Sequence, residues 1–216
     1  MTRTKLLVLS AITIIFCPPT KAFATTVINA ASRGWIEQTG DTNGSSATNN
    51  YISGNCGLGD CSDGEFRSWF QFSIPALPGP IASARLLIAT VVVHDEQGPT
   101  MTLAVTSLPV GFGFSDLGTG TFYGSRVYSA ADANTIRSIS LNASALADIA
   151  ASELGTFGAS TRISSGAIFG PTEPNQYVFG FSQADSVQLE ITFIPEPSTL
   201  AICGLGLLTI VRRWRR

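Results

Sequence analysis

Hydrophobic and polar residues alternate along many short segments between Thr25 and Phe193. In segment 186–193 (SVQLEITF), Val, Leu, Ile and Phe alternate with Gln, Glu and Thr, and in segment 101–108 (MTLAVTSL), Met, Leu and Val alternate with Thr and Ala. A β-strand places successive side chains on opposite faces, so a period of two gives it one apolar and one polar face. Both segments are therefore predicted to be half-buried strands.

Two further segments have a different pattern. Segment 66–73 (FRSWFQFS) places three phenylalanines on one face and Arg67, Trp69 and Gln71 on the other. Segment 84–93 (ARLLIATVVV) is apolar on both faces, as expected for a strand buried at the centre of a sheet. Shorter strand patterns occur at residues 26–30, 35–36, 50–53, 121–128, 135–141, 161–164 and 177–181.

Segment 142–155 (NASALADIAASELG) is the one helical pattern. Asn142 is a suitable N-cap, and Gly155 can adopt the left-handed conformation that ends a helix. The residues expected on the buried face are Leu146, Ile149, Ala150 and Leu154. Many short strands between Gly, Pro and Asn turns, with one short helix, predict an all-β fold over residues 25–193, mainly an antiparallel β-sandwich of jelly-roll type.

The first 24 residues have the pattern of a signal peptide. Arg3 and Lys5 precede an apolar stretch, and Ala22 and Ala24 occupy the two small-residue positions of a cleavage site. We therefore expect residues 1–24 to be removed by signal peptidase after Ala24. A buried first helix is disfavoured because Pro18 would interrupt it.

The last residues of the chain indicate a membrane anchor. The run 200–211 carries no charge, but as a helix it would be about 18 Å long, shorter than the roughly 30 Å hydrocarbon core. Extending it over 197–214 gives about 27 Å. Four arginines follow within 212–216 and mark the cytoplasmic side. We expect a membrane helix over 198–211 and a cytoplasmic tail over 212–216.

The triplet Pro195, Glu196 and Pro197 stands directly before this apolar run. A proline-flanked glutamate, an apolar helix and a terminal arginine cluster together resemble the PEP-CTERM sorting signal of exported bacterial proteins. The resemblance implies that residues 194–216 form a sorting signal, and that 195–197 are read by an exosortase, a membrane enzyme that cleaves near the motif and passes the body to the cell surface. Proline keeps such a site extended and accessible.

The body resembles, more loosely, a group of proteins that carry the same kind of signal. The shared motifs lie at 34–36 (GWI), 50–54 (NYISG), 83–86 (SARL), 141–149 (LNASALADI) and 178–182 (VFGFS). This resemblance implies a fold and export, and no activity comes with it.

Charge is unevenly distributed. Between Thr25 and Glu196 there are six arginines, no lysine and all 15 acidic residues, which is a formal charge of −9. Nucleic-acid binding requires basic side chains that neutralise phosphates, so this acidic body argues against a nucleic-acid partner. An exported protein is the better fit.

Cys56 and Cys61 enclose a four-residue loop. In an oxidising compartment the expected interpretation is a disulfide. Zinc is the alternative, but His94 is the only histidine of the chain, and a zinc site usually requires four ligands. The sequence thus predicts a disulfide and no cofactor.

Oxygen ligands suited to calcium occur in two loops, at Asp41, Asn43, Asp60 and Asp63, with Glu65 beside the second loop. Their spacing does not match the calcium-loop pattern. The alternative is that they are turn residues that cap their own backbone.

His94, Asp95 and Glu96 are adjacent and resemble a catalytic cluster. Successive strand residues point to opposite faces, so these three cannot all meet one substrate. A turn role is the simpler interpretation. A hydrolase would need Asp95 or Glu96 close to Glu65, and nothing in the sequence brings them together.

Aromatic side chains offer one possible ligand surface. Trp69 shares its strand face with Arg67, and we expect this face to be exposed and able to stack against a sugar. The alternative is that the aromatics belong to the core. The wider set considered for such a surface is Trp35, Tyr51, Trp69, Tyr123 and Tyr128.

Taken together, these patterns favour an exported, exosortase-processed surface or extracellular-matrix protein with a non-catalytic body. It would first be anchored in the inner membrane with the body facing the periplasm, and would then reach the cell surface or the exterior. Two alternatives stay open. The first is a module that binds exopolysaccharide, and the second is a secreted hydrolase.

Overall fold

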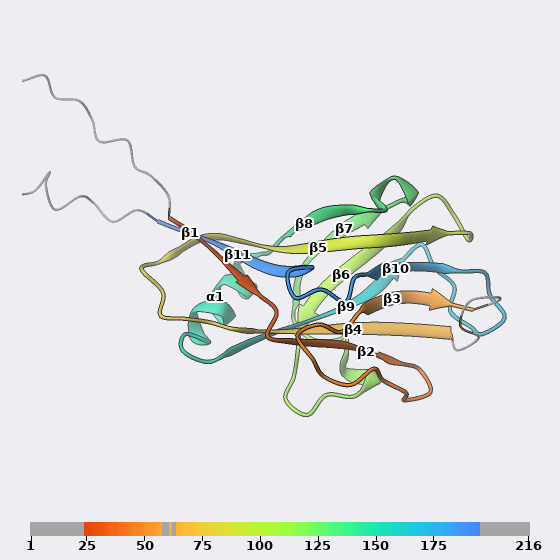
Figure 1. Ribbon diagram of the computed structural model, residues 1–216, viewed down its shortest axis with the longest axis horizontal. Helices are drawn as coiled ribbons and strands as arrows, with labels where there is room; N and C mark the ends of the chain where they lie inside the picture. Colours follow the sequence, from red (N-terminus) through yellow and green to blue (C-terminus); the bar gives the residue numbers. More distant parts are fainter. Residues whose placement is uncertain (1–23, 58–60, 62–63, 195–216) are drawn as a thin grey trace, which may run out of the picture. The chain divides into compact units, whose positions relative to one another are not determined.

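Eleven β-strands and one α-helix make up the described part of the chain, residues 24–57, 61 and 64–194 of a computed structural model (Figure 1). The strands are β1 (Thr25–Asn29), β2 (Ser32–Glu37), β3 (Tyr51–Cys56), β4 (Gly64–Ser73), β5 (Ile81–Asp95), β6 (Met101–Ser107), β7 (Phe122–Tyr128), β8 (Thr135–Ser140), β9 (Thr156–Ser165), β10 (Gln176–Gly180) and β11 (Val187–Phe193). The helix is α1 (Ala143–Ala151). Every segment predicted to be a strand overlaps one of these strands.

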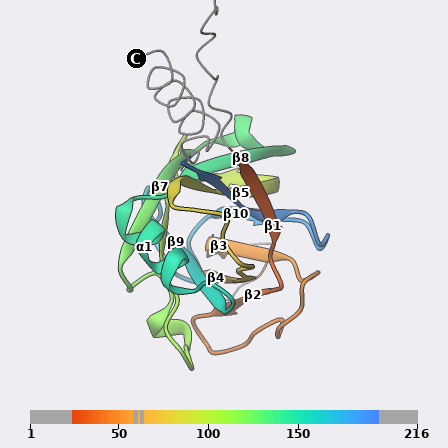
Figure 2. The same cartoon turned by 90° about the vertical axis from the view of Figure 1, so that its left-hand side faces the viewer.

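All strand pairs of this region are antiparallel. The order is β1-β11-β5-β10-β3-β4-β9-β6-β7, with β2 added to β4 and β8 added to β5. The sheet folds back on itself, so that β5 and β8 lie across the core from β4 and β2 (Figures 1 and 2). The predicted all-β, mainly antiparallel fold with one helix is confirmed.

The core lies between the two layers of this folded sheet. Strand β11 shows the expected alternation most clearly, because its four apolar residues are at most 2% exposed while the residues between them are partly exposed. Phe70 and Phe72 of β4 and Leu103 of β6 complete the same cluster. The period-two pattern therefore identified the strand faces that form the core.

Strand β5 differs from its prediction. A strand buried on both faces was expected over 84–93, but Leu87, Ala89 and Val91 are only partly buried. Strand β5 has hydrogen-bonded neighbours on both edges, with β8 on one edge and β10 and β11 on the other. Only its inner face packs against the core, so the side chains on its outer face stay partly exposed.

Helix α1 begins as predicted, because the Asn142 side chain accepts a hydrogen bond from the Ala145 N–H at 3.2 Å. Its end differs. The helix stops at Ala151, and Leu154 takes the left-handed conformation (φ 59°) that was expected of Gly155. Leu154 lies beyond the helix and is 79% exposed. Ala150 is exposed as well, so the prediction that these two residues are buried is wrong.

The predicted signal peptide up to residue 23, the sorting triplet and the predicted membrane helix over 198–211 lie outside the described residues. Within the described residues, no helix has the length and apolarity to cross a membrane.

Candidate functional site

The two ends of the body lie beside each other. Strands β1 and β11 pair with Thr25 opposite Thr192. The Phe193 N–H donates to the Ala24 carbonyl at 2.9 Å, and the Ile194 N–H donates to the Pro80 carbonyl at 2.9 Å. The predicted signal cleavage point and the start of the predicted sorting signal therefore leave the body at the same place (Figure 1).

Trp69 and Arg67, predicted to form an exposed ligand face, are buried at 4% and 8% exposure. The Trp69 ring packs against Phe112, with ring centroids 5.1 Å apart. Segment 108–121, which joins β6 and β7, covers this face of β4. The expectation of an exposed sugar-stacking face at these residues is therefore wrong.

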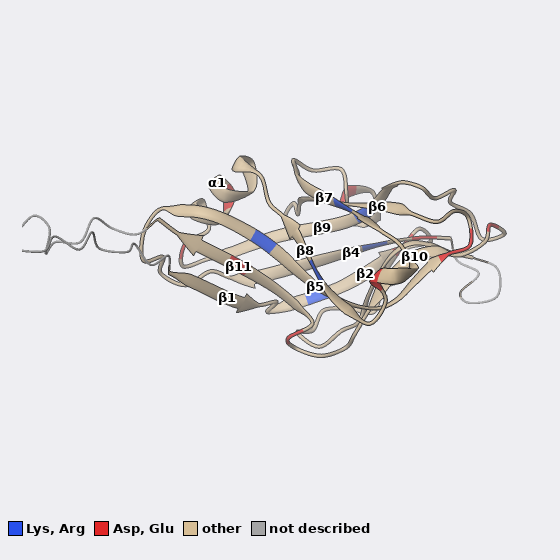
Figure 3. Cartoon of the chain, turned by 90° about the horizontal axis from the view of Figure 1, so that it is seen from above, with Lys and Arg blue, Asp and Glu red and all other residues tan. Residues whose placement is uncertain are grey.

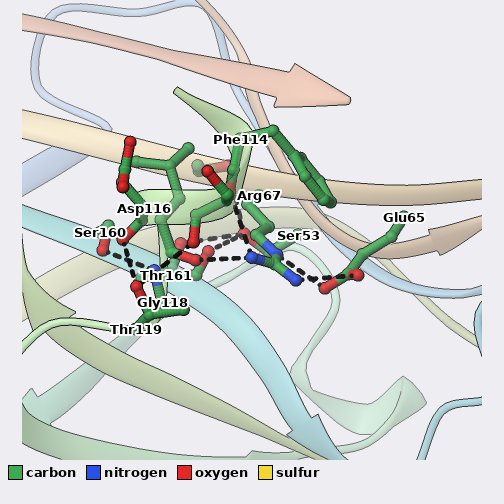
Figure 4. A network of polar contacts seen from close by, with 12 residues as sticks. Ser53, Glu65, Arg67, Phe114, Asp116, Gly118, Thr119, Ser160 and Thr161 are labelled. Atoms are coloured by element: carbon green, nitrogen blue, oxygen red, sulfur yellow. Dashed lines mark hydrogen bonds and ion pairs between the residues drawn. The ribbon is translucent and has the colours of Figure 1, made fainter. Parts of the chain in front are cut away.

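Arg67 holds segment 108–121 in place (Figure 4). Its guanidinium makes two parallel bonds to the Glu65 carboxylate, at 2.8 and 3.0 Å, and donates to the Phe114 and Leu117 carbonyls at 3.1 and 3.0 Å. It also lies 4.2 Å from the centroid of the Phe114 ring. A charge this buried is tolerated because its donors are paired.

Hydroxyl groups continue the network beneath this segment (Figure 4). Ser53 contacts Thr161 at 2.9 Å, and the Ser160 hydroxyl accepts from the Gly118 N–H at 2.9 Å. These groups satisfy each other and the backbone. We interpret the network as structural, joining β3, β9 and segment 108–121.

The remaining aromatic candidates do not form an exposed surface. Trp35 is partly buried, packs edge-on against Phe66 with centroids 5.1 Å apart, and donates to the Asn50 side chain at 3.2 Å. The tyrosines at 51, 123 and 128 are at most 2% exposed. The alternative interpretation of these residues as core is the correct one.

His94 and Glu96 lie at the end of β5 and in the turn that follows. The His94 Nδ1 is 3.4 Å from Glu96 Oε1, and the imidazole is tilted by 41° against the ring of Tyr177, with ring centroids 4.6 Å apart. Glu96 also accepts from the Asn175 N–H at 2.9 Å. These contacts fix the turn after β5, in agreement with a turn role.

Asp95 and Glu65, one of the two carboxylate pairs considered for a hydrolase, are not brought together. The sheet register aligns Asp95 with Gln176, Gln176 with Asn55, and Asn55 with Glu65. Three strand spacings, about 14 Å along the sheet, exceed the roughly 5–9.5 Å between paired carboxylates of glycosidases. Glu65 is moreover paired with Arg67. This particular acid pair is therefore rejected.

Cys56 and Cys61 form the predicted disulfide, with their Cα atoms 5.4 Å apart. It closes the loop between β3 and β4. Cys56 is completely buried beside Phe66 and Tyr177 in a small apolar cluster, so the bond joins the loop to packed structure.

The calcium candidates are only partly described, because Asp60 and Asp63 lie outside the described residues. Asn43 uses its side-chain oxygen to accept from the Trp35 N–H at 2.9 Å, and its amide donates to the Asn50 carbonyl at 2.9 Å. Asp41 is exposed. Among the described residues, no group of three or more His, Cys, Asp or Glu could hold a metal ion. Asn43 thus has the turn role.

A pocket of about 220 Å³ was not predicted from the sequence. It lies between the start of β8, the middle of β5 and the loop 181–186 that joins β10 to β11. Phe181 (39% exposed) and Ile136 (64% exposed) give it an apolar wall. The polar residues that line it include Asn134, Gln183 and Asp185.

Arg33 holds the loop 181–186, which lines this pocket, through hydrogen bonds to its backbone. The side chain is fully buried, and it donates to the Asn49 carbonyl at 2.6 Å and to the carbonyls of Phe181 and Gln183. Burial lowers the pKa of Arg33, and the charge of Asp185 partly opposes this effect. In the sequence, Arg33 stands between the short strand patterns at 26–30 and 35–36, and nothing there indicates the loop that it reaches.

Comparison with known proteins concerns the end of the chain. Residues 193–216 match the family model described as the PEP-CTERM protein-sorting motif. The match confirms the resemblance seen at 195–197 and implies an exported protein that associates with a membrane during sorting and is processed by an exosortase. No curated protein matches the chain significantly.

Proposed function

We propose that this chain is a surface or extracellular-matrix protein whose β-sandwich body is non-catalytic and is released from a temporary membrane anchor. The observation that carries the proposal is the position of the sorting motif. The match begins at Phe193, the last residue of β11, so the sorting signal follows the folded body directly.

The itinerary has three stages. Signal peptidase removes residues 1–24, the apolar run after Pro197 holds the body on the periplasmic side of the inner membrane, and an exosortase then cleaves near Glu196. The charge distribution supports this orientation in the membrane. Arginines at 212–216 favour a cytoplasmic tail, and the acidic body is left outside.

The sorting step is tested with Glu196→Gln in a host that contains an exosortase. We expect the variant to keep its arginine tail and to stay in the membrane fraction, while the wild-type body leaves it. Asp41→Asn, which removes an exposed carboxylate of the body outside the sorting signal, is the matched control and is expected to behave as wild type. Normal release of Glu196→Gln would contradict the proposal.

A second candidate function, binding of exopolysaccharide, is favoured by the pocket beside Phe181. An exposed aromatic ring offers an apolar surface for a sugar ring, while carboxylate and carboxamide groups can bond its hydroxyls. The pocket is smaller than the roughly 300–1,000 Å³ of drug-sized sites, which suits a single sugar unit.

Polysaccharide pull-down from the native matrix tests this candidate. Phe181→Ala and Asp185→Ala are expected to reduce retention. Phe122→Ala truncates another exposed phenylalanine, outside the pocket (52% exposed), and is expected to bind the polysaccharide as the wild type does. A wild-type protein that binds no polysaccharide rules the candidate out.

A further inference from the structure

One end of the body, here called the anchor end, surrounds the place where both chain termini leave. It consists of residues 24–25, 74–81, 152–156 and 193–194. Backbone contacts join these segments: the Ile74 N–H donates to the Gly155 carbonyl at 2.9 Å, and the Ile194 N–H donates to the Pro80 carbonyl. The segments of the anchor end therefore lie beside one another at one end of the body (Figures 1 and 2).

The anchor end is apolar and almost uncharged. Leu154 is 79% exposed and Ile194 is 51% exposed, and Pro75, Ala76 and Pro78 are exposed beside them. Glu153 is the only charged residue among these segments, and its carboxylate accepts from the Leu77 N–H at 2.8 Å. Exposed apolar surface of this kind marks a contact with a partner or a membrane.

Acidic residues lie at the opposite end of β5. This strand begins at the anchor end with Ile81 and reaches Asp95 after about 45 Å, at 3.3 Å per residue. Glu96 and Glu173 are in the turns there, which meet through a 3.1 Å bond from the Glu96 N–H to the Asn175 carbonyl. Figure 3 shows acidic positions in these turns. An anionic lipid surface would repel this end, with Asp95, Glu96 and Glu173, more strongly than the anchor end, with Glu153 alone.

The length of the tether limits where the body can be. Only residues 195–199 separate Ile194 from the uncharged run that begins at Leu200. Even fully extended, six residue steps span at most about 22 Å. The polar headgroup layer takes up about 5–8 Å of this distance on each side of a bilayer.

We infer that the anchor end rests on the lipid headgroup layer while the tail is in the membrane, with Leu154, Ile194 and the proline-rich segment 74–80 as the contact surface. This inference rests on the proposed membrane stage of sorting. The partner of this contact surface is the lipid headgroup layer itself. Contact would hold the body upright on the bilayer and keep Glu196 at the membrane surface, within reach of a membrane-embedded enzyme.

The test uses the full chain in vesicles of phosphatidylcholine and the anionic phosphatidylglycerol that also contain a lipid with a nitroxide on its headgroup. A fluorophore is attached at Leu154→Cys or, as the matched control, at Thr172→Cys, which is exposed in a turn at the acidic end. Cys17 and Cys203 are replaced by serine in both. We expect the nitroxide to remove most of the fluorescence at position 154 and little at position 172.

Equal quenching at the two positions in chains that float with the vesicles would overturn the inference and leave the sorting enzyme as the partner of this surface. Chains that do not float would contradict the membrane stage of the proposed function, and the inference with it. A second variant, Ala76→Glu with Pro78→Glu, adds charge to the contact surface and is expected to reduce quenching at position 154. Unchanged quenching in that variant would also count against contact at segment 74–80.

Discussion

Two buried arginines, Arg33 and Arg67, organise the loops of this body through backbone carbonyls. Each lies on a strand and reaches a loop distant in sequence: Arg33 holds 181–186, and Arg67 holds 108–121. Guanidinium groups suit this task because they stay charged and present five donors in a fixed plane. Loss of either should therefore loosen a loop as well as destabilise the core.

Arg67→Met is expected to be strongly destabilising. It leaves the Glu65 carboxylate buried without its partner, a change that costs about 3–5 kcal/mol for a buried pair. Urea unfolding of the wild type and the variant measures the difference. The double variant Glu65→Gln/Arg67→Met removes the unpaired carboxylate and should recover part of the lost free energy of unfolding. An Arg67→Met variant as stable as wild type would refute the role assigned to the pair.

Asp132 gives the body a pH-dependent contact. Burial alone would raise the pKa of this carboxyl, but the Ser129 N–H and the guanidinium of Arg137 outweigh burial, so the pKa lies below its ordinary value of 3.8. A carboxyl with a lowered folded-state pKa stabilises the protein above its unfolded-state pKa, and this stabilisation is lost as the pH falls through the folded-state pKa.

We therefore expect Asp132→Asn to lower the free energy of unfolding by about 1–3 kcal/mol at pH 7. The difference from wild type should shrink as the pH falls below about 4. Thermal unfolding from pH 7 to pH 2 measures it. A difference that is the same at every pH would show that the charge of Asp132 is not responsible.

At the scale of elements, the Tyr51 side chain of β3 passes over Gly180 of the neighbouring strand β10 and joins β3 to β5. The Tyr51 hydroxyl donates to the Ala89 carbonyl of β5 at 2.5 Å, and its ring packs edge-on against Phe70 at 5.5 Å. Gly180, at the end of β10, lies directly against this ring, and a Cβ there would overlap the phenol. Only glycine therefore fits at position 180.

Gly180→Ala should consequently destabilise the body by at least the roughly 1–3 kcal/mol of an overpacked core. Gly98→Ala is the matched control, because a Cβ at Gly98 meets no atom within 4 Å. Thermal melts of the two variants are compared. Equal melting temperatures would contradict the packing described for Tyr51.

The strands could be predicted because a period-two pattern is local. What covers a strand face is not local, and Trp69 shows the difference. Its neighbours Arg67 and Gln71 made its face look like a solvent face, but a glycine-rich segment from 108 to 121 folds over it. The exposed position of Leu154 was missed for a related reason, since helical periodicity does not say at which residue the helix stops.

The pocket beside Phe181 could not be predicted, because it combines β5, the start of β8 and the loop 181–186 from separate parts of the chain. Polar residues of a loop carry no signal of the surface that they will face. The disulfide at Cys56 and the sorting triplet could be predicted, since each depends on residues that are close in sequence.

At the scale of the whole molecule, an acidic β-rich body lies in the sequence between a predicted signal peptide and the matched sorting motif. Pairing of β1 with β11 places Thr25 and Thr192 opposite each other, so the two predicted processing points follow from the same end of the body, where Glu153 is the one charged residue of the anchor end. Both cuts are predictions, and each is expected close to the end of a strand. Neither cut removes a residue from strands β1 or β11 if they fall after Ala24 and near Glu196.

The most direct test of this account is mass spectrometry of the mature protein from its native host, reading both termini. The account predicts an N-terminus at Thr25 and a C-terminus near Glu196, without the arginine tail. A mature protein that still ends at Arg216 would contradict it, because the sorting signal would then be a permanent anchor.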